Sequence, residues 1–71
     1  MFDKDYLSYV IKNRKWLIED FIVELGMTRQ TFYKKVKEPK RFTYQEMMKI
    51  VEILNLNESE ILSIFFKNNV A

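Results

Sequence analysis

The stretch FIVELGMTRQTFYKKV, at residues 21–36, decides the fold of this chain. Apolar residues recur every fourth position over residues 17–25, which predicts a helix with one apolar face. Gly26 follows directly, and glycine readily adopts the left-handed conformation that ends many helices. Thr28 can accept a hydrogen bond from the free N–H groups that begin a new helix over residues 29–36. The sequence therefore predicts two helices joined by a tight turn.

The rest of the chain is also predicted to be helical, because apolar residues are spaced three and four apart and no stretch alternates as a strand does. The further helices are expected over residues 3–14, 44–54 and 58–66. Thr43 with Glu46, and Asn57 with Glu60, have the spacing of helix-starting caps. The tail at residues 67–71 has little to bury and is expected to fray. The prediction is a single all-α domain of five helices over residues 1–71.

The composition excludes several classes of protein. A hydrophobic content of 48% in 71 residues indicates one folded domain rather than a disordered chain. Cysteine and histidine are both absent, which removes disulfides, thiolate and imidazole catalysis, and ordinary zinc sites. A single glycine is too few for a phosphate-binding loop or a dinucleotide fingerprint. We therefore expect neither an enzyme, nor a metal site, nor a cofactor.

No part of the sequence indicates a membrane protein. No apolar run approaches the roughly 18 residues that cross a bilayer, and the first residues, MFDKDY, are unlike a signal peptide. No predicted helix pairs a lysine-rich face with a large apolar face, which a membrane-surface helix needs. A soluble, intracellular protein is expected.

The basic residues are concentrated in the middle of the chain. Residues 29–41 carry six basic residues and one acidic residue, a net charge of +5, although the whole chain has a net charge of only +2. Residues 16–28, directly before this block, carry three acidic residues and no basic one, a net charge of −3. A basic block is either a solvated helix surface or an electrostatic footprint for phosphates.

Two helices joined by a turn at residues 25–28 are typical of a helix-turn-helix, in which the second helix enters the major groove of DNA. Phe32 and Val36 are the apolar pair of this second helix, so most of its surface is expected to face outward. Arginine can pair with guanine and glutamine with adenine, which makes Arg29 and Gln30 candidates for base recognition. The other outward candidates, mostly for phosphate contact, are Tyr33, Lys34, Lys35, Lys37, Lys40 and Arg41.

The chain has more apolar residues than one small core can bury. The surplus is expected to lie at the surface, which predicts a binding partner. The predicted partner-binding residues are Leu17, Ile18, Ile64 and Phe66. The partner is either a second copy of the chain or another protein. Trp16, just before the second helix, is interpreted as a hydrophobic staple against that helix, with a binding aromatic as the alternative.

The stretch from Leu25 to Phe66 resembles the lambda-repressor-like, Cro/C1-type helix-turn-helix domains, especially the small Cro-like regulators of phages that infect Gram-positive bacteria. The matching features are an apolar residue before a glycine turn, a threonine before the recognition helix, a basic loop, and the closing motif LNLNESEI. The resemblance implies a five-helix bundle that binds double-stranded operator DNA as a dimer in the bacterial cytoplasm. The DNA-facing positions it implies are Thr28, Arg29, Gln30, Thr31, Tyr33 and Lys34.

Two functions follow as hypotheses. The first is a transcriptional regulator of the Cro-like kind that occupies an operator. The second is an antirepressor, a protein-interaction module that keeps this fold but binds a phage repressor and alters its DNA binding. At the start of this helix the family often has a threonine or serine as cap and a glutamine that binds phosphate. This chain has Leu17 and Ile18 there, which can do neither, and this favours the second hypothesis.

Overall fold

The computed structural model describes residues 2–66, which form five α-helices and one short 3-10 helix, without a strand in that range. The elements are α1 (Lys4–Asn13), α2 (Ile18–Leu25), α3 (Arg29–Lys37), η1 (Pro39–Arg41), α4 (Tyr44–Leu54) and α5 (Glu58–Phe65). This confirms the predicted all-α, five-helix fold. The expectation for residues 67–71 concerns a part of the chain outside the described residues.

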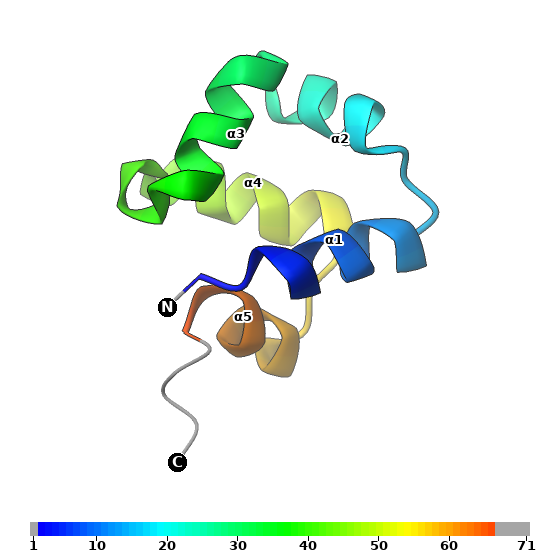
Figure 1. The fold of residues 1–71 in the computed structure, drawn as a ribbon. Helices are drawn as coiled ribbons and strands as arrows, with labels where there is room; N and C mark the ends of the chain where they lie inside the picture. Colours follow the sequence, from blue (N-terminus) through cyan, green and yellow to red (C-terminus); the bar gives the residue numbers. More distant parts are fainter. Residues whose placement is uncertain (1, 67–71) are drawn as a thin grey trace.

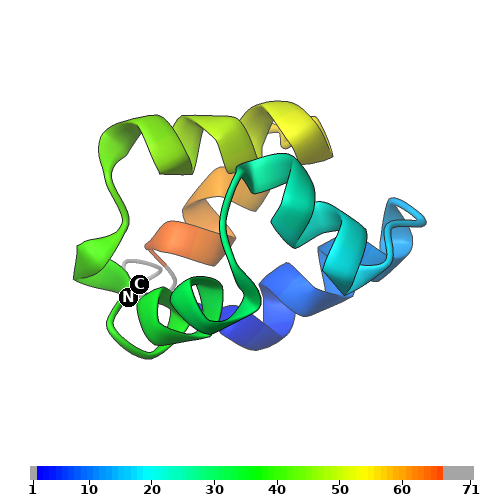
Figure 2. The same ribbon diagram turned by 90° about the horizontal axis from the view of Figure 1, so that it is seen from above.

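The helices pack around one core, with α2 and α3 above, α1 and α4 in the middle, and α5 below (Figure 1). From above, α4 runs along one edge of the bundle, and α1 and α3 lie along the opposite edge (Figure 2). Helix α2 packs against both α1 and α4, and α5 packs against α1. The helix-turn-helix therefore rests on α1 and α4 through α2, and α5 supports α1 from the other side.

The starts of α4 and α5 are fixed by capping boxes. The Thr43 side chain accepts from the Glu46 N–H at 3.0 Å, and the Glu46 carboxylate accepts from the Thr43 N–H at 3.0 Å. Asn57 and Glu60 form the same pair of bonds, at 2.8 and 3.0 Å. Each box satisfies two otherwise unpaired N–H groups. At the start of α2, in contrast, Leu17 occupies the cap position and has no side-chain hydrogen bond to offer.

Three helices end in a left-handed residue. These are Lys15 after α1, Gly26 after α2 and Asn55 after α4, with φ angles of 65°, 78° and 51°. In each case the N–H of the next residue bonds back to a carbonyl five positions earlier, at 3.0 to 3.2 Å. Gly26 and Asn55 are residues that adopt this conformation readily, whereas a lysine rarely does.

Phe21 lies at the centre of the core and is completely buried. Its ring meets Trp16 edge-on at 6.3 Å and Phe32 edge-on at 6.1 Å between centroids. Trp16 precedes the cap residue of α2 and Phe21 is the fourth residue of the helix, so the contact is the predicted hydrophobic staple. The other buried apolar residues are Leu7, Val10, Ile11, Ile22, Leu25, Phe32, Phe42, Ile50, Leu54, Leu56 and Ile64.

One predicted surface residue belongs to this core. Ile64 was expected to face a partner, but its side chain is completely buried. Helix α5 packs on α1, and the Ile64 carbonyl accepts a hydrogen bond from the Asp3 N–H at 2.7 Å. Ile64 therefore fastens α5 to the start of α1 and is unavailable to a partner.

Arg14, at the end of α1, links three helices. Its guanidinium donates to the Leu54 carbonyl at the end of α4 at 2.9 Å, and to the Glu60 carboxylate of α5 at 2.7 Å. Hydrogen bonds from Arg14 and from the Asn57 N–H lower the pKa of Glu60. The pair holds the lower helices together and leaves α3 outside this network.

Candidate nucleic-acid interface

Helix α3 is attached to the bundle by a narrow strip of its surface. Phe32 is its single buried residue, and Val36 is half-buried beside it. Gln30, Lys34 and Lys37 follow each other four and three positions apart, so they share the opposite face, and all three are exposed. Neither Lys34 nor Lys37 forms an ion pair within residues 2–66. This face can approach a polyanion without breaking an existing contact.

Arg29 and Tyr33 are four positions apart, so they lie side by side along one margin of that face. Arg29 pairs with Glu19 of α2 at 3.1 Å, and both side chains are well exposed. Such a pair contributes only about 0.2–1 kcal/mol, so a stronger partner can displace the carboxylate. Tyr33 packs edge-on against Phe32 at 5.3 Å and remains 43% exposed. Both side chains are therefore available along one edge of the outward face, not at its centre.

The two threonines at the start of α3 bond to each other. Thr28 accepts from the Thr31 N–H at 3.1 Å, which caps the helix as predicted, and its hydroxyl donates to Thr31 Oγ1 at 2.9 Å. A hydroxyl has one donor and two acceptor positions, so the Thr31 proton stays free for a further acceptor. Both residues are exposed, next to Gln30. This corner of α3 can thus donate to a phosphate oxygen.

Lys35 lies apart from the outward lysines. Its ammonium group contacts the Glu46 carboxylate of α4 at 2.6 Å, and its side chain is only 18% exposed. Partial burial raises the pKa of Glu46, but hydrogen bonds from Lys35 and Thr43 and the charge of Lys35 outweigh this, so the pKa is lowered. Lys35 therefore fastens α3 to α4, and reaching a phosphate would require it to leave Glu46.

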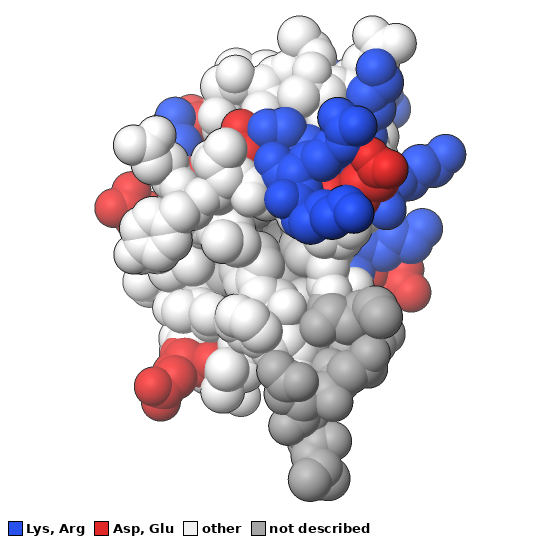
Figure 3. Space-filling model, turned by 90° about the vertical axis from the view of Figure 1, so that its left-hand side faces the viewer, with Lys and Arg blue, Asp and Glu red and all other residues white. Residues whose placement is uncertain are grey.

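The basic block ends on η1. Lys40 and Arg41 are exposed there, and Arg41 forms an ion pair with Glu38, the residue that ends α3. Lysine and arginine side chains gather on the side of the molecule that carries the end of α3 and η1 (Figure 3). Of the sequence-predicted cations of residues 34–41, the exposed ones lie on α3 and η1, and Lys35 is turned toward α4; the exposed ones are Lys34, Lys37, Lys40 and Arg41.

A family model matches residues 6–67 of this chain, and it describes a Cro/C1-type HTH DNA-binding domain. The match covers most of the chain. The chain belongs to the Cro/C1-type helix-turn-helix family. Membership supports a DNA-binding transcriptional regulator with double-stranded DNA as a partner. Searches of curated proteins and of solved structures returned no match.

In this Cro/C1-type domain the helix before the turn is acidic. Glu19, Asp20 and Glu24 of α2 are all exposed, and α2 carries no basic residue. Val23 lies among them with 72% of its surface exposed. The two helices of the motif therefore carry opposite charges on their solvent-facing sides, which the charge count along the chain had indicated.

The remaining predicted partner residues of the Cro/C1-type domain lie at the surface to different degrees. Leu17 is 70% exposed, Phe66 is exposed at the end of α5, and Ile18 is half-buried. Among residues 2–66, no group of three or more acidic, cysteine or histidine side chains is arranged to hold a metal ion. No helix in that range has the length and hydrophobicity needed to cross a membrane.

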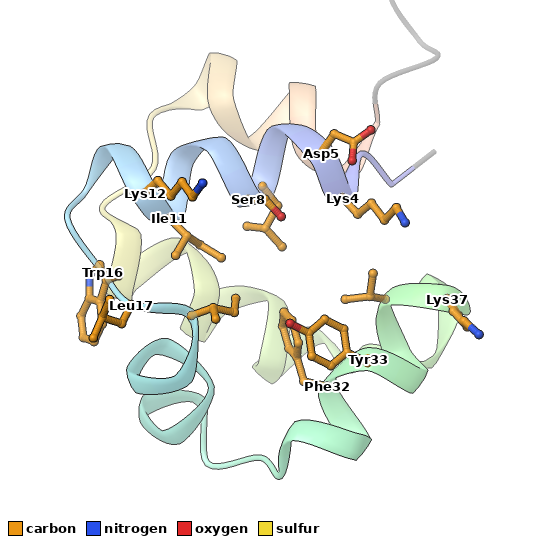
Figure 4. Close-up of a pocket in the computed structure, with 13 residues that line it drawn as sticks. Lys4, Asp5, Ser8, Ile11, Lys12, Trp16, Leu17, Phe32, Tyr33 and Lys37 are labelled. Carbon is orange, nitrogen blue, oxygen red and sulfur yellow. The ribbon is translucent and has the colours of Figure 1, made fainter.

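One surface feature was not predicted from the sequence. A groove of about 850 Å³ separates α1 from the α2–α3 unit (Figure 4). On its α1 side, Lys4, Ser8 and Lys12 recur every fourth position. That polar stripe is visible in the sequence, but only the packing shows that it faces Tyr33 and Lys37 of α3.

Proposed function

We propose that this protein is a Cro-like regulator, of the kind that phages carry, and that it binds operator DNA by placing α3 in the major groove. Gln30 and Arg29 read base edges, and Thr28, Thr31 and Tyr33 contact the DNA beside them. Lys34, Lys37, Lys40 and Arg41 bind phosphates, and Lys35 joins them only if it leaves Glu46. Occupying the operator excludes other proteins from it, and no catalytic step is needed.

One observation carries this proposal: the outward face of α3 holds Gln30 in line with Lys34 and Lys37, which form no ion pair within the described residues. An amide can donate to and accept from adenine, which gives about 1–3 kcal/mol of discrimination between bases. Lysines supply affinity without sequence preference, because each neutralised phosphate releases condensed counterions. Specificity and affinity are thus assigned to different side chains of one helix.

The proposal includes a dimer, since dimers of helix-turn-helix proteins read two half-sites about one DNA turn apart. Exposed apolar residues support a contact between copies, with Leu17 and Phe66 as the candidates. Sedimentation of the protein with and without its selected duplex tests this part separately. We expect two copies on the DNA.

The test begins with selection of a preferred duplex from a random pool, followed by titrations at several salt concentrations. Four phosphate contacts predict a slope of log K against log salt of about −4. Gln30→Ala should relax base preference, whereas Lys37→Ala should weaken binding to every duplex and reduce the slope by about 1. Lys15→Ala, which removes the same charge from the α1–α2 connection, is the control. Equal effects of all three variants would contradict the assignment.

A second candidate function is favoured by the start of α2. Leu17 occupies the cap position there, largely exposed and unable to bind a phosphate. The acidic surface of α2 also opposes a DNA backbone. Both features support an antirepressor that binds a phage repressor through α2 and Leu17.

The two candidates differ in their response to salt. A DNA reader loses affinity steeply as salt rises, whereas an apolar protein contact changes little. No detectable binding to any selected duplex at low salt would favour the antirepressor. Loss of activity in Leu17→Ser, with DNA binding intact, would point in the same direction.

A further inference from the structure

The groove between α1 and the helix-turn-helix has an apolar floor. Its lining includes the buried residues Leu7, Ile11 and Phe32, and the half-buried residues Trp16, Ile18 and Val36. The rings of Phe32 and Tyr33 project from α3 into this space (Figure 4). Leu17, which is largely exposed, and Tyr33, which is 43% exposed, add apolar surface at its margin. The groove therefore has apolar surface to bury against an occupant.

The rim of the groove is cationic. It carries Lys4 and Lys12 of α1 and Lys37 of α3, with Asp5 as its single carboxylate. Lys12 lies at the end marked by Leu17 and Trp16, and Lys4 and Lys37 lie toward the other end (Figure 4). None of the three lysines forms an ion pair within residues 2–66, although four other cations do. The charge of the rim therefore favours an occupant with carboxylates along both edges.

The dimensions of the groove favour a helix. From Lys4 to Lys12, α1 borders it for about 12 Å, the rise of about two helical turns. A helix with apolar residues three and four apart buries such a stripe in a groove between two helices. Its flanking positions then meet the rim lysines. A small organic acid would reach only one end of this cationic rim.

We propose that this groove binds a short amphipathic helix of another protein, whose apolar stripe is flanked by carboxylates. The apolar stripe packs against Leu17, Ile18 and Tyr33, and the carboxylates pair with Lys4, Lys12 and Lys37. This assignment goes beyond DNA binding. It identifies a protein-docking surface and the chemistry of its partner.

The docking surface overlaps the proposed DNA surface. Tyr33 and Lys37 line the groove and also belong to the cationic side of α3. A helix in the groove would cover both and place carboxylates where phosphates would lie. Only this competition rests on the proposed function, because binding in the groove needs no DNA.

The test uses a synthetic 14-residue helical peptide with leucines three and four positions apart and glutamates flanking them. Its matched control has lysine in place of every glutamate. Trp16, the single tryptophan of the chain, lines the groove and reports binding by fluorescence without a label. We expect the acidic peptide to shift Trp16 emission and the basic peptide to leave it unchanged.

Charge reversal then locates the peptide. The double variant Lys4→Glu/Lys12→Glu should raise the Kd of the acidic peptide by about tenfold or more, since it turns two attractions into repulsions. Lys49→Glu, on α4 and outside the groove, should change it by less than about twofold. In a mixture with a selected duplex, the acidic peptide should displace DNA.

Four results would overturn the proposal. They are equal binding of both peptides, no binding up to millimolar peptide, an unchanged Kd in the double variant, and displacement of the peptide by decanoate at the same concentration. The last would assign the groove to small organic acids. Failure to bind DNA would leave the peptide result standing, so the two proposals fail independently.

Discussion

Helices α2 and α3, adjacent in the chain and in space, are attached to the domain in opposite ways. Helix α2 buries Phe21, Ile22 and Leu25, whereas α3 buries only Phe32. Helix α2 carries only acidic charges and α3 only basic ones. Apolar packing over a whole face thus holds α2, while α3 is held by Phe32, half-buried Val36 and the Lys35–Glu46 pair.

The contrast assigns different roles to the two helices: α2 anchors the motif in the core, and α3 presents side chains to a partner. A helix that gives one face to the core can turn only its other face to a partner, and that face of α2 repels phosphate. A helix that buries only one residue, as α3 does, can turn most of its surface toward a partner. Substitutions inside α2 should therefore act through folding, and substitutions on α3 should act through binding.

The largest expected effect is the loss of folding in Phe21→Ala. Removing a buried phenylalanine costs about 3–5 kcal/mol. A core of this size supplies about the same total, so the variant should be mostly unfolded at 25 °C. Val23→Ala on the solvent side of α2, and Lys34→Ala on α3, should each shift stability by less than about 0.5 kcal/mol. Urea unfolding followed by circular dichroism measures all three.

A wild-type midpoint in Phe21→Ala would show that α2 is not the anchor. A large loss in Lys34→Ala would show that the attachment of α3 depends on more than Phe32, Val36 and the Lys35–Glu46 pair. Either result would remove the distinction between the two helices.

The next effect is a pair of opposite changes in DNA affinity. Neutralising α2 with Glu19→Gln, Asp20→Asn and Glu24→Gln should raise affinity for any duplex at low salt by about tenfold, because the first helix of the motif lies across the backbone. Lys34→Gln with Lys37→Gln should lower it by a similar factor and reduce the salt slope by about 2. Filter binding at three salt concentrations provides the numbers.

Unchanged affinity after neutralising α2 would place this helix away from the DNA backbone. The docking geometry of α3 would then differ from the one proposed. If the lysine variant also bound as wild type, the basic block would be a solvated helix surface.

The helices and most of their caps were predictable because each depends on neighbouring residues. Thr43 with Glu46, and Gly26 after an apolar stripe, carry their signal within one or two turns of sequence. The end of α1 had no such local signal, because Lys15 adopts a left-handed conformation that a lysine side chain disfavours. The staple of Trp16 on Phe21, the next contact along the chain, was predictable, but it does not indicate that the residue before Trp16 is left-handed.

The candidate site was predictable in composition and less so in arrangement. Counting charges located the basic block, but not the pairing of Lys35 with Glu46 across eleven residues. The spacing of apolar residues did not show that Ile64 is buried and Phe66 is exposed, because both come after the predicted apolar stripe of the last helix. The groove could not be predicted from the sequence, because its two sides belong to α1 and α3, which are separated in the chain by α2 and its connections.

A smaller effect is expected at the turn between the two helices. Gly26 has a φ of 78°, and a Cβ there would meet only Lys49 Nζ, at 3.8 Å. Gly26→Ala should therefore cost about 1–2 kcal/mol through its backbone alone. Gly26→Asn should cost less, because asparagine tolerates this region, as at Asn55. Lys15→Gly should stabilise the domain by up to about 1 kcal/mol. Equal losses in both Gly26 variants would indicate a steric cause.

The smallest effect is a difference in acid sensitivity between α2 and α3. The Glu46 pKa is lowered below its ordinary value of 4.5, so the folded state favours the carboxylate over the acid. The stability that this gives is complete above about pH 4.5 and is lost as pH falls through the lowered pKa. Helix α3 depends on this pair, whereas α2 depends on apolar packing that does not titrate.

Amide hydrogen exchange between pH 6 and 3, corrected for intrinsic rates, should show α3 losing protection before α2. Glu46→Gln keeps the cap of α4, because glutamine also serves in a capping box, but removes the charge. In that variant α3 should be less protected at pH 6 and lose its extra acid sensitivity, while the Arg14–Glu60 pair still titrates. If α2 and α3 lost protection together in both proteins, the helix-turn-helix would open as one unit and α3 would be as firmly anchored as α2.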